Sequence, residues 1–409
     1  MSHDRLRVLI SGASIAGPTT AYWLSRQGFD VTVVERMPLA RVRTSGHAVD
    51  LFGPAMDVTD WTGVLTAVMD ARTRTETVSF QRPDGRAVDV QMRRLVGGIS
   101  GRHVEVMRGQ LAAILYEATR HDVGYVFEDS IRTMKEEADG VAVTFEHATA
   151  DRFDLVIGAD GLHSNVRRLV FGPEDQFRHF LGGYLAFAAI PNYLGLEGRM
   201  EVWNAPGRLA AIYPVHGTTT ARGGFLFRRG EELQLDHHDV GAQKQVLHRI
   251  YGRDGWEVPR LLAEMDAAED FYFDSISQIV MSSWTRGRVT LVGDAGYSPG
   301  PAVGGGTSIA VVGGYVLAQE LALAGSSWPS GLRVYEGRMR ELVEKARGIG
   351  PATMSSLIPR TALQVRLMPE LLRLLTRMPP RLQQRLFQLQ ATPARALDSI
   401  SLTRSTVER

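Results

Sequence analysis

The sequence contains no cysteine. This absence excludes a disulfide framework, a thiolate nucleophile, a cysteine-bound metal and a redox-active dithiol. An excess of charge of one sign is also lacking, because the formal net charge is +1 at pH 7. Such a balance gives the chain as a whole no electrostatic drive toward nucleic acid or an anionic membrane. We therefore expect no nucleic-acid partner.

Long hydrophobic runs are missing as well. The most apolar stretch, Ile309 to Ala318, contains two adjacent glycines and ends at two polar residues, far short of a membrane span. The first residues, MSHDRLRVLI, place charges beside a short apolar strand, which is not the pattern of a secretory signal. We expect a soluble, cytoplasmic protein with no stable membrane insertion.

Clusters of metal-binding side chains are scarce. His237, His238 and Asp239 are adjacent in sequence, but neighbouring residues rarely converge on one ion, and no third ligand follows at a known spacing. We interpret this segment as a polar loop and expect no metal site. Nor is there a convincing arrangement of serine, histidine and aspartate for nucleophilic catalysis, so no catalytic residue is assigned.

The chain has 409 residues, with 44% hydrophobic and 22% charged, which is typical of a globular protein of two or three lobes. Near its start, an apolar strand from Arg5 to Ile10 precedes a Gly/Ser turn and a helix from about Pro18 to Gln27. A second buried strand follows over Asp30 to Glu35. This order predicts a β-α-β unit whose parallel strands are joined by a right-handed crossover.

Later segments predict a second, antiparallel sheet. Thr77 to Val90 holds PDG between two β-rich runs, which indicates a hairpin. Four strand-like runs with turn residues between them follow from Gly183 to Arg229. The pattern of parallel and antiparallel segments predicts an α/β fold with two different sheets.

The tail from Gly331 onward is basic and helical in pattern. Its prolines are expected to divide it into short helices; they are Pro359, Pro369, Pro379 and Pro380. Leucines 371, 372, 374 and 375 are expected to face the body of the protein, with the arginines toward water. A helix lying on a membrane surface is the alternative, which short helices would disfavour.

A dinucleotide fingerprint follows the first strand. Gly12 permits a tight turn, Ser14 replaces the usual middle glycine, and Gly17 lets helix and strand pack closely. Ile15 and Ala16 lie in the same turn, at the helix N-terminus where N–H groups can meet a pyrophosphate. Glu35 ends the second strand, where a carboxylate would accept hydrogen bonds from a ribose, and Arg36 follows it.

Two later motifs carry a family resemblance. The segment from Asp154 to Arg167, DLVIGADGLHSNVR, resembles the DG motif of flavoprotein hydroxylases, and RVTLVGDA from Arg288 resembles their GD motif. PAVGGGTS, which begins at Pro301, resembles the loop beneath the flavin in these enzymes. The sequence is thus similar to class A FAD-dependent monooxygenases of the para-hydroxybenzoate hydroxylase type, over about Arg5 to Gly325.

This resemblance implies a Rossmann-type FAD-binding domain, an antiparallel-sheet substrate domain and a C-terminal helical extension. The expected boundaries are 1–75, 100–180 and 275–330 for the first, 76–99 and 181–274 for the second, and 331–409 for the third. The resemblance implies further cofactor residues, namely Arg108, Asp160, Asp294, Pro301, Gly304, Gly305, Gly306 and Thr307.

A more specific resemblance lies in Arg43-Thr-Ser-Gly-His-Ala-Val-Asp50. An R-x-x-G-x-x-x-D segment after the second strand is similar to that of tetracycline-inactivating flavin monooxygenases. By this resemblance Arg43 would meet the nicotinamide cofactor and Asp50 the flavin. A surface arginine and a loop-capping aspartate are an equally weighted interpretation. His47, between them, is a candidate site histidine.

The resemblance implies that NAD(P)H reduces the FAD and that O2 then forms a C4a-hydroperoxide. This species would hydroxylate a phenolic or polycyclic aromatic small molecule, as in secondary metabolism or antibiotic modification. A FAD-dependent reductase or dehydrogenase, or a flavin-binding module without turnover, is the alternative. Candidate substrate contacts in the second lobe are Tyr213, His216, Arg222 and Phe225, although for each residue taken singly sheet packing or a turn position is the favoured interpretation.

The sequence departs from the family pattern at three positions. Ser14 replaces glycine, Tyr297 stands where many members have histidine, and Ser308 stands where asparagine is common. The last change removes an amide from the expected edge of the flavin, and we expect it to alter how the ring is held.

Overall fold

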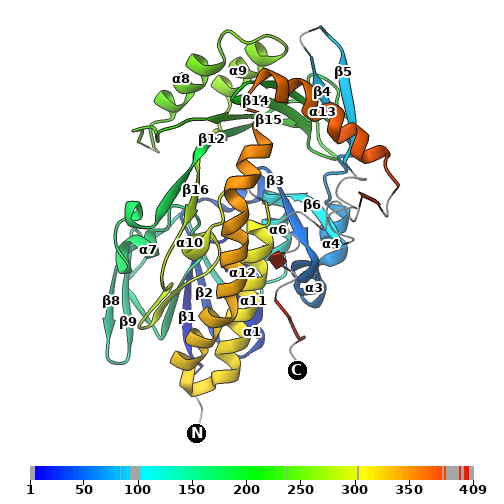
Figure 1. Ribbon diagram of the computed structural model, residues 1–409. Coiled ribbons are helices and arrows are strands. Elements are labelled where there is room, and N and C mark those ends of the chain that lie inside the picture. Colours follow the sequence, from blue (N-terminus) through cyan, green and yellow to red (C-terminus); the bar gives the residue numbers. More distant parts are fainter. Residues whose placement is uncertain are drawn as a thin grey trace.

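The computed structural model describes residues 5–82, 84–92, 102–236, 238–301, 304–379, 382–383, 396–397 and 400–404. Two lobes lie one above the other, and the long helix α12, Trp328–Leu357, runs from the lower lobe to the upper one (Figure 1). The lower lobe holds the N-terminal strands, and the upper lobe holds a mostly antiparallel sheet, in which only β13 and β4 pair in parallel, with helices on its outer face.

The lower lobe is built on a six-stranded sheet in the order β17-β18-β11-β1-β2-β7. Its strands are β1 Arg7–Ser11, β2 Asp30–Glu35, β7 Gly124–Phe127, β11 Leu155–Gly158, β17 Thr285–Arg286 and β18 Val289–Leu291. All neighbours are parallel except β17 and β18. Helices α1, Ala16–Arg26, and α11, Gly306–Ala324, pack together at this sheet. The predicted β-α-β unit is confirmed.

The upper lobe is built on a seven-stranded sheet in the order β16-β12-β15-β14-β13-β4-β5. Its strands are β4 Thr77–Gln81, β5 Ala87–Gln91, β12 Arg178–Pro191, β13 Arg199–Ala205, β14 Arg208–Pro214, β15 Thr220–Arg228 and β16 Tyr272–Ile279. One face packs on helices α8, Val240–Tyr251, and α9, Val258–Ala267, through a large apolar cluster. The predicted hairpin and the four predicted strands are confirmed.

Smaller elements complete the lower lobe. Two strands, β3 Ala48–Phe52 and β6 His103–Met107, form an antiparallel ribbon, and β8 Ile131–Glu137, β9 Gly140–Phe145 and β10 Asp151–Phe153 form a three-stranded sheet. The short helices are α2 Leu39–Thr44, α3 Gly53–Trp61, α4 Leu65–Asp70, α6 Arg108–Glu117, α7 Asn165–Val170, η1 Glu174–Gln176, α10 Asp294–Tyr297 and η2 Gly325–Ser327.

The prediction that prolines cut the tail into short helices is confirmed in part: Pro359 and Pro379 lie outside the helices, but Pro369 does not, and the helices are longer than expected. Pro380 lies outside the described residues. Helix α12 has 30 residues with Pro351 inside it, and α13, Ala362–Arg377, has 16 with Pro369 inside it. An internal proline costs roughly 3 kcal/mol, but α12 buries an apolar stripe along its length that outweighs this cost. The members of that stripe include Leu332, Tyr335, Met339, Leu342, Ile349 and Met354.

The expected orientation of the tail leucines is also wrong in part. Leu371 and Leu374 are 58% and 56% exposed, because α13 turns Pro369 and Thr376 toward the protein instead. One window within Gly306–Met354 is long and apolar enough to cross a membrane, but 72% of it is buried. This apolar segment therefore lies mostly in the protein core.

Candidate functional site

The turn after β1 requires glycine at two positions. Gly12 has φ of 110°, its N–H donates to the carbonyl of Val34 at 2.8 Å, and a Cβ there would clash with the carbonyl of Ala159. A Cβ on Gly17 would clash in turn with the carbonyl of Gly12. No side chain caps α1, which begins at Ala16, and its first turn holds no acidic residue. Its N-terminus can therefore receive an anion.

Glu35 closes this turn from the neighbouring strand. Its buried carboxylate accepts from the N–H of Ala13 at 2.8 Å and from the N–H of Met37 at 2.9 Å. Each carboxylate oxygen keeps a second lone pair for a further donor. Arg36, the next residue, is exposed. The predicted fingerprint residues thus lie together at the carboxyl edge of the parallel sheet, with Ser14 partly exposed beside them.

Two titratable side chains near this edge combine exposed surface with strong desolvation. Asp294 is accessible to solvent, yet burial raises its pKa. Tyr272 is 39% exposed, yet burial raises its pKa well above the usual value. Desolvation disfavours the charged form of each group, so both hold their protons more tightly than in water.

The charge of Arg108 acts on three titratable side chains near this edge, namely Asp294, Tyr272 and His47. Its positive charge lowers the pKa of Asp294 and of Tyr272, in each case opposing the effect of burial. Burial, with the charges of Arg108 and Arg222, lowers the pKa of His47 to about 4, so this imidazole is neutral at pH 7. Because Arg108 is the first residue of α6, its cation at the helix N-terminus favours a nearby anion.

A second glycine turn faces Asp294. Gly304 and Gly305 have φ of 85° and 78°, and α11 begins at Gly306 with no side-chain cap and no acid in its first turn. A Cβ on Gly306 would lie 3.8 Å from Oδ1 of Asp294, so the two motifs are neighbours. Thr307 follows in the helix and Pro301 precedes the turn, whereas residues 302 and 303 lie outside the described residues.

The structure does not join Arg43 to Asp50. Arg43, on α2, pairs with Glu117 and lies over the ring of Tyr116, 5.1 Å from its centroid. Asp50, on β3, contacts Nε2 of His103 at 2.6 Å instead. Both interpretations of this segment remain predictions, and His103 is a partner that the sequence did not indicate.

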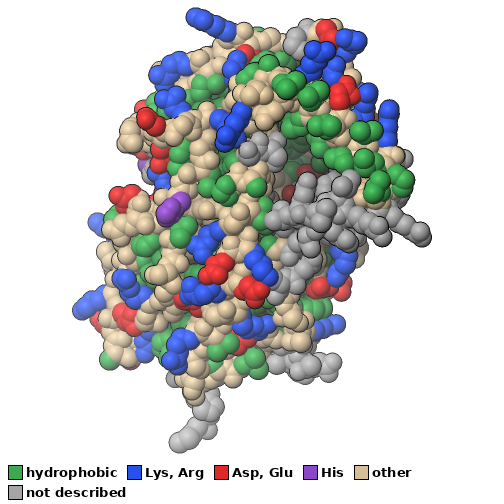
Figure 2. All heavy atoms as spheres, in the orientation of Figure 1, with side chains coloured by type: hydrophobic (Ala, Val, Ile, Leu, Met, Phe, Trp, Pro, Cys, Tyr) green, Lys and Arg blue, Asp and Glu red, His purple; other side chains and the backbone are tan. Residues whose placement is uncertain are grey.

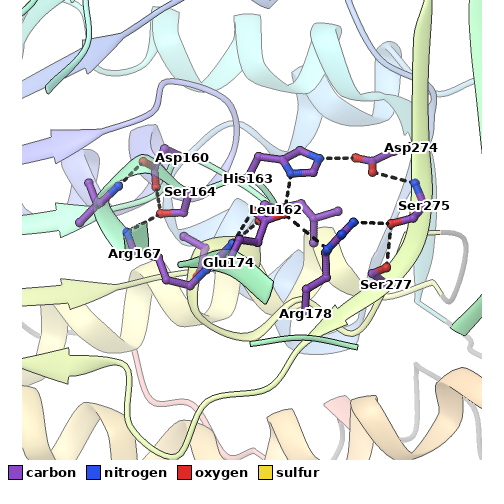
Figure 3. Close-up of polar contacts among 12 residues, drawn as sticks. Asp160, Leu162, His163, Ser164, Arg167, Glu174, Arg178, Asp274, Ser275 and Ser277 are labelled. Atoms are coloured by element: carbon purple, nitrogen blue, oxygen red, sulfur yellow. Dashed lines mark hydrogen bonds and ion pairs between the residues drawn. The ribbon is translucent and has the colours of Figure 1, made fainter. Parts of the chain in front are cut away.

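The DG motif binds the two lobes together (Figure 3). Asp160 accepts from Oγ of Ser164 at 2.5 Å and from the N–H of Val166 at 3.0 Å, which closes the start of α7. Burial raises the pKa of Asp160. Arg167, fully buried, donates to the carbonyl of Ala295 at 2.8 Å and so connects the DG motif to the GD motif.

His163 extends this network to the upper sheet. Its ring nitrogens lie 2.9 Å from Glu174 and 3.0 Å from Asp274, which belongs to β16 (Figure 3). Burial alone would lower the pKa of His163, but the hydrogen bonds and charges of Asp274 and Glu174 raise it to about 9. His163 is therefore charged at pH 7 and pairs with acids from both lobes.

A second set of contacts holds the loop between α2 and β3 against the upper sheet. Arg222 donates to the carbonyl of Thr44 at 2.6 Å and pairs with Asp270. The hydroxyl of Tyr213 accepts from the N–H of Ala48 at 3.3 Å. Two of the four suggested substrate contacts, Arg222 and Tyr213, thus contact the loop between α2 and β3.

The other two suggested substrate contacts lie elsewhere. Phe225 is fully buried in the apolar cluster beneath α8 and α9, on the opposite face of the sheet, so that suggestion is wrong. His216 is exposed in the turn between β14 and β15. Strand alternation could have separated Phe225 from Arg222, three residues earlier on β15.

Two departures from the family pattern have structural roles here. The Ser308 hydroxyl donates to the carbonyl of Asp50 and accepts from the N–H of Phe52, both at 3.0 Å, and so fastens α11 to β3. Buried Tyr297 contacts the hydroxyl of Tyr335 on α12 at 2.9 Å. Tyr272, by contrast, was not indicated by any local motif. Within the described part of the chain, no group of acidic and histidine side chains could hold a metal.

Known proteins were compared with this chain. A family model described as an FAD binding domain matches residues 5–347. An uncharacterised protein of Mycobacterium tuberculosis is 45% identical over 341 residues, covering 83% of this chain and 91% of that protein. A flavin-dependent monooxygenase of Legionella longbeachae is 37% identical over 345 residues, covering 84% and 88%.

Solved structures agree with the sequence matches. The tetracycline destructase Tet(51) superposes with a TM-score of 0.83 at 32% identity, covering 98% of this chain and 99% of that one. Klebsiella pneumoniae HpxO, complexed with FAD and uric acid, has the same fold at 23% identity and a TM-score of 0.68, covering 94% and 96%. The FAD-binding domain, the parallel sheet and the antiparallel second sheet are thus shared features. The chain belongs to the class A family of flavin-dependent monooxygenases.

Proposed function

We propose that this monooxygenase hydroxylates a phenolic or polycyclic aromatic small molecule, with NAD(P)H as electron donor and O2 as oxidant, in the cytoplasm. The single observation that carries the proposal is the group formed by Asp294, Tyr272 and His47 around Arg108, whose charge acts on the pKa of all three. Asp294 lies beside Gly306 at the uncapped start of α11, at the edge of the sheet where uncapped α1 also begins.

The residues present fit FAD. The turn after β1 would hold the pyrophosphate, and Glu35 would accept from the adenosine ribose with its remaining lone pairs. Asp294 would accept from the ribityl chain, and Arg108 would balance negative charge nearby. The residues proposed to hold the cofactors are Gly12, Ser14, Ile15, Ala16, Gly17, Glu35, Arg36, Arg43, Asp50, Arg108, Asp160, Asp294, Pro301, Gly304, Gly305, Gly306 and Thr307.

When bound, FAD supplies the redox chemistry: it takes a hydride from NAD(P)H and activates O2. The chain positions the substrate and excludes water. The N–H groups at the start of α11 are suited to stabilise negative charge on a reduced ring. Neutral His47 can donate or accept one hydrogen bond without adding charge beside Arg108.

The inner face of the upper sheet supports an aromatic substrate. Its buried residues are apolar and include Leu185, Ala211 and Leu226, with Met354 and Ile358 from the end of α12 packed in the same cluster. Phe187 packs against this cluster and offers a flat ring toward the loop that carries His47. A planar polycyclic molecule matches such a surface better than a flexible or charged one does. The 32% identity to a tetracycline destructase favours the same choice.

Steady-state NAD(P)H oxidation by the purified yellow protein tests this proposal, using a panel of phenols, polyketide-like aromatics and tetracyclines. We expect at least one aromatic to accelerate oxidation and to gain an oxygen atom. Hydrogen peroxide release is measured in parallel, because uncoupled turnover also consumes NAD(P)H. Acceleration by non-aromatic ligands alone would contradict the proposed substrate class. Bound FAD that no pyridine nucleotide reduces would contradict the proposed electron donor.

A further inference from the structure

Helix α13 carries more apolar surface than the protein covers. Its exposed leucines are Leu363, Leu367, Leu371 and Leu374, with exposures of 65%, 45%, 58% and 56%, and Leu382 beyond its end is 48% exposed. With 3.6 residues per turn, the four helical leucines fall on one face. Figure 2 shows hydrophobic side chains gathered over this helix. We call these five leucines the leucine face.

The leucine face does not result from poor docking of the helix. Helix α13 packs across β5 and β13 of the upper sheet, and it buries Pro369 and Thr376 there. A capping box fixes its start. The Thr361 hydroxyl accepts from the N–H of Gln364, and the Gln364 side chain accepts from the N–H of Thr361. One face of the helix thus packs on the sheet, and a different face, which carries the leucines, is turned toward solvent.

Basic side chains flank the leucine face. Residues 358 to 385 include six arginines and a single acidic residue, Glu370. Glu370 already pairs with Arg82 and Arg373. Arg360, Arg366 and Arg377 are exposed, and within the described residues no acid pairs with them. The local charge is therefore strongly positive although the whole chain carries only +1.

We propose that the leucine face and its arginines bind the surface of an anionic lipid bilayer, with α13 lying in the plane of the interface. Exposed leucines along one face and an arginine-rich flank are the features of interfacial helices, and the unpaired arginines complement anionic head groups. A second copy of the chain is a poorer partner, because facing copies would bring the same unpaired arginines together.

Such adsorption would place one edge of the substrate lobe against the bilayer without inserting any segment across it. Proline does not keep this helix short, since Pro369 lies within the 16 residues of α13. The helix is therefore long enough to lie on a membrane surface. Binding is independent of catalysis, so its failure would leave the proposed function intact.

Co-sedimentation of the full chain with vesicles tests the proposal. We expect binding to vesicles of equal parts phosphatidylcholine and phosphatidylglycerol, weaker binding at high salt, and little binding to phosphatidylcholine alone. The variant Leu367→Ser/Leu371→Ser/Leu374→Ser should lower the partition coefficient at least about tenfold. The control Leu323→Ser/Val334→Ser removes exposed apolar side chains elsewhere and should bind as the parent does.

A pair of charge-reversal variants separates the contribution of the arginines from that of the leucines. Arg366→Glu/Arg377→Glu should also reduce binding to anionic vesicles about tenfold. Arg249→Glu/Arg253→Glu makes the same change of net charge at exposed positions on and after α8 and should not. Absence of binding to anionic vesicles, or equal losses in variants and controls, would overturn the proposal. A dimer in light scattering that the leucine variant abolishes, without vesicle binding, would assign this face to a second copy instead.

Discussion

The ring of His47 lies parallel to that of Phe187, with centroids 5.1 Å apart and planes 19° from each other. His47 belongs to the loop between α2 and β3, and Phe187 belongs to β12 of the upper sheet. Together with the contacts of Arg222 and Tyr213 to the same loop, this stacking holds the loop against the upper sheet. A substrate that displaces the upper sheet will therefore displace the loop.

The variant Arg222→Gln is expected to loosen this connection. It removes the partner of Asp270 in a pair whose side chains are only 8% and 24% exposed. We expect a loss of about 3 kcal/mol in the free energy of unfolding, because the remaining charge is left without its partner. Chemical denaturation measures it. Arg86→Gln, which breaks an exposed pair with Asp84, should leave the unfolding midpoint unchanged; equal shifts would contradict a role for the loop contact.

Gly12 and Gly28 form a matched test of the cofactor turn. Both have positive φ, at 110° and 86°, but only Gly12 has a carbonyl in the way of a Cβ. Gly28→Ala should cost about 1 kcal/mol from backbone strain alone. Gly12→Ala should cost at least about 3 kcal/mol and abolish FAD retention during purification. If Gly12→Ala retains FAD as the parent does, the proposed pyrophosphate site is wrong.

The pH dependence of stability tests the lobe junction. The pKa of His163 is raised to about 9 in the folded protein, against 6.5 for the ordinary side chain. Its contribution, about 3 kcal/mol, is fully present below pH 6.5 and is lost as pH rises through 9. His163→Gln should therefore flatten the alkaline limb of the stability profile while the acid limb persists. An unchanged alkaline limb in this variant would show that His163 is not charged in the folded protein.

Asp294 provides the most direct test of the ribityl contact. Asp294→Ala removes an acceptor that would bind hydroxyl groups, and a hydrogen bond to a charged group contributes about 1.5–3 kcal/mol. We expect the dissociation constant for FAD to rise at least about tenfold in a fluorescence titration. Asp139→Ala, at an exposed position in the turn between β8 and β9, is the control. Equal affinities in the two variants would place the flavin elsewhere.

The elements that the sequence predicted well are those with local signals. The β-α-β unit, the hairpin and the four strands of the upper sheet all follow from periodicity and turn residues, and the structure confirms them. The segment from Tyr125 to Phe145, in contrast, divides between two sheets. Its first part, β7, joins the parallel sheet, and only β8 and β9 pair with each other.

The parts that the sequence could not predict depend on long-range contacts. The proline rule is wrong at Pro369, because the packing of α13 on β5 and β13 has no local signal. Tyr272 and Asp274 reach the site from β16, which is more than 100 residues from the DG motif in sequence. The pairing of His163 with Asp274 arises only when the two lobes meet.

Product analysis under isotope-labelled O2 tests the central claim most directly. The FAD-loaded enzyme, NAD(P)H and the aromatic that most accelerates oxidation are incubated together, and the product is examined by mass spectrometry. We predict one labelled oxygen atom in the product for each coupled turnover, and loss of the product with Asp294→Ala at limiting FAD. A product without labelled oxygen, or NAD(P)H oxidation that yields only hydrogen peroxide with every aromatic, would contradict aromatic hydroxylation by this enzyme.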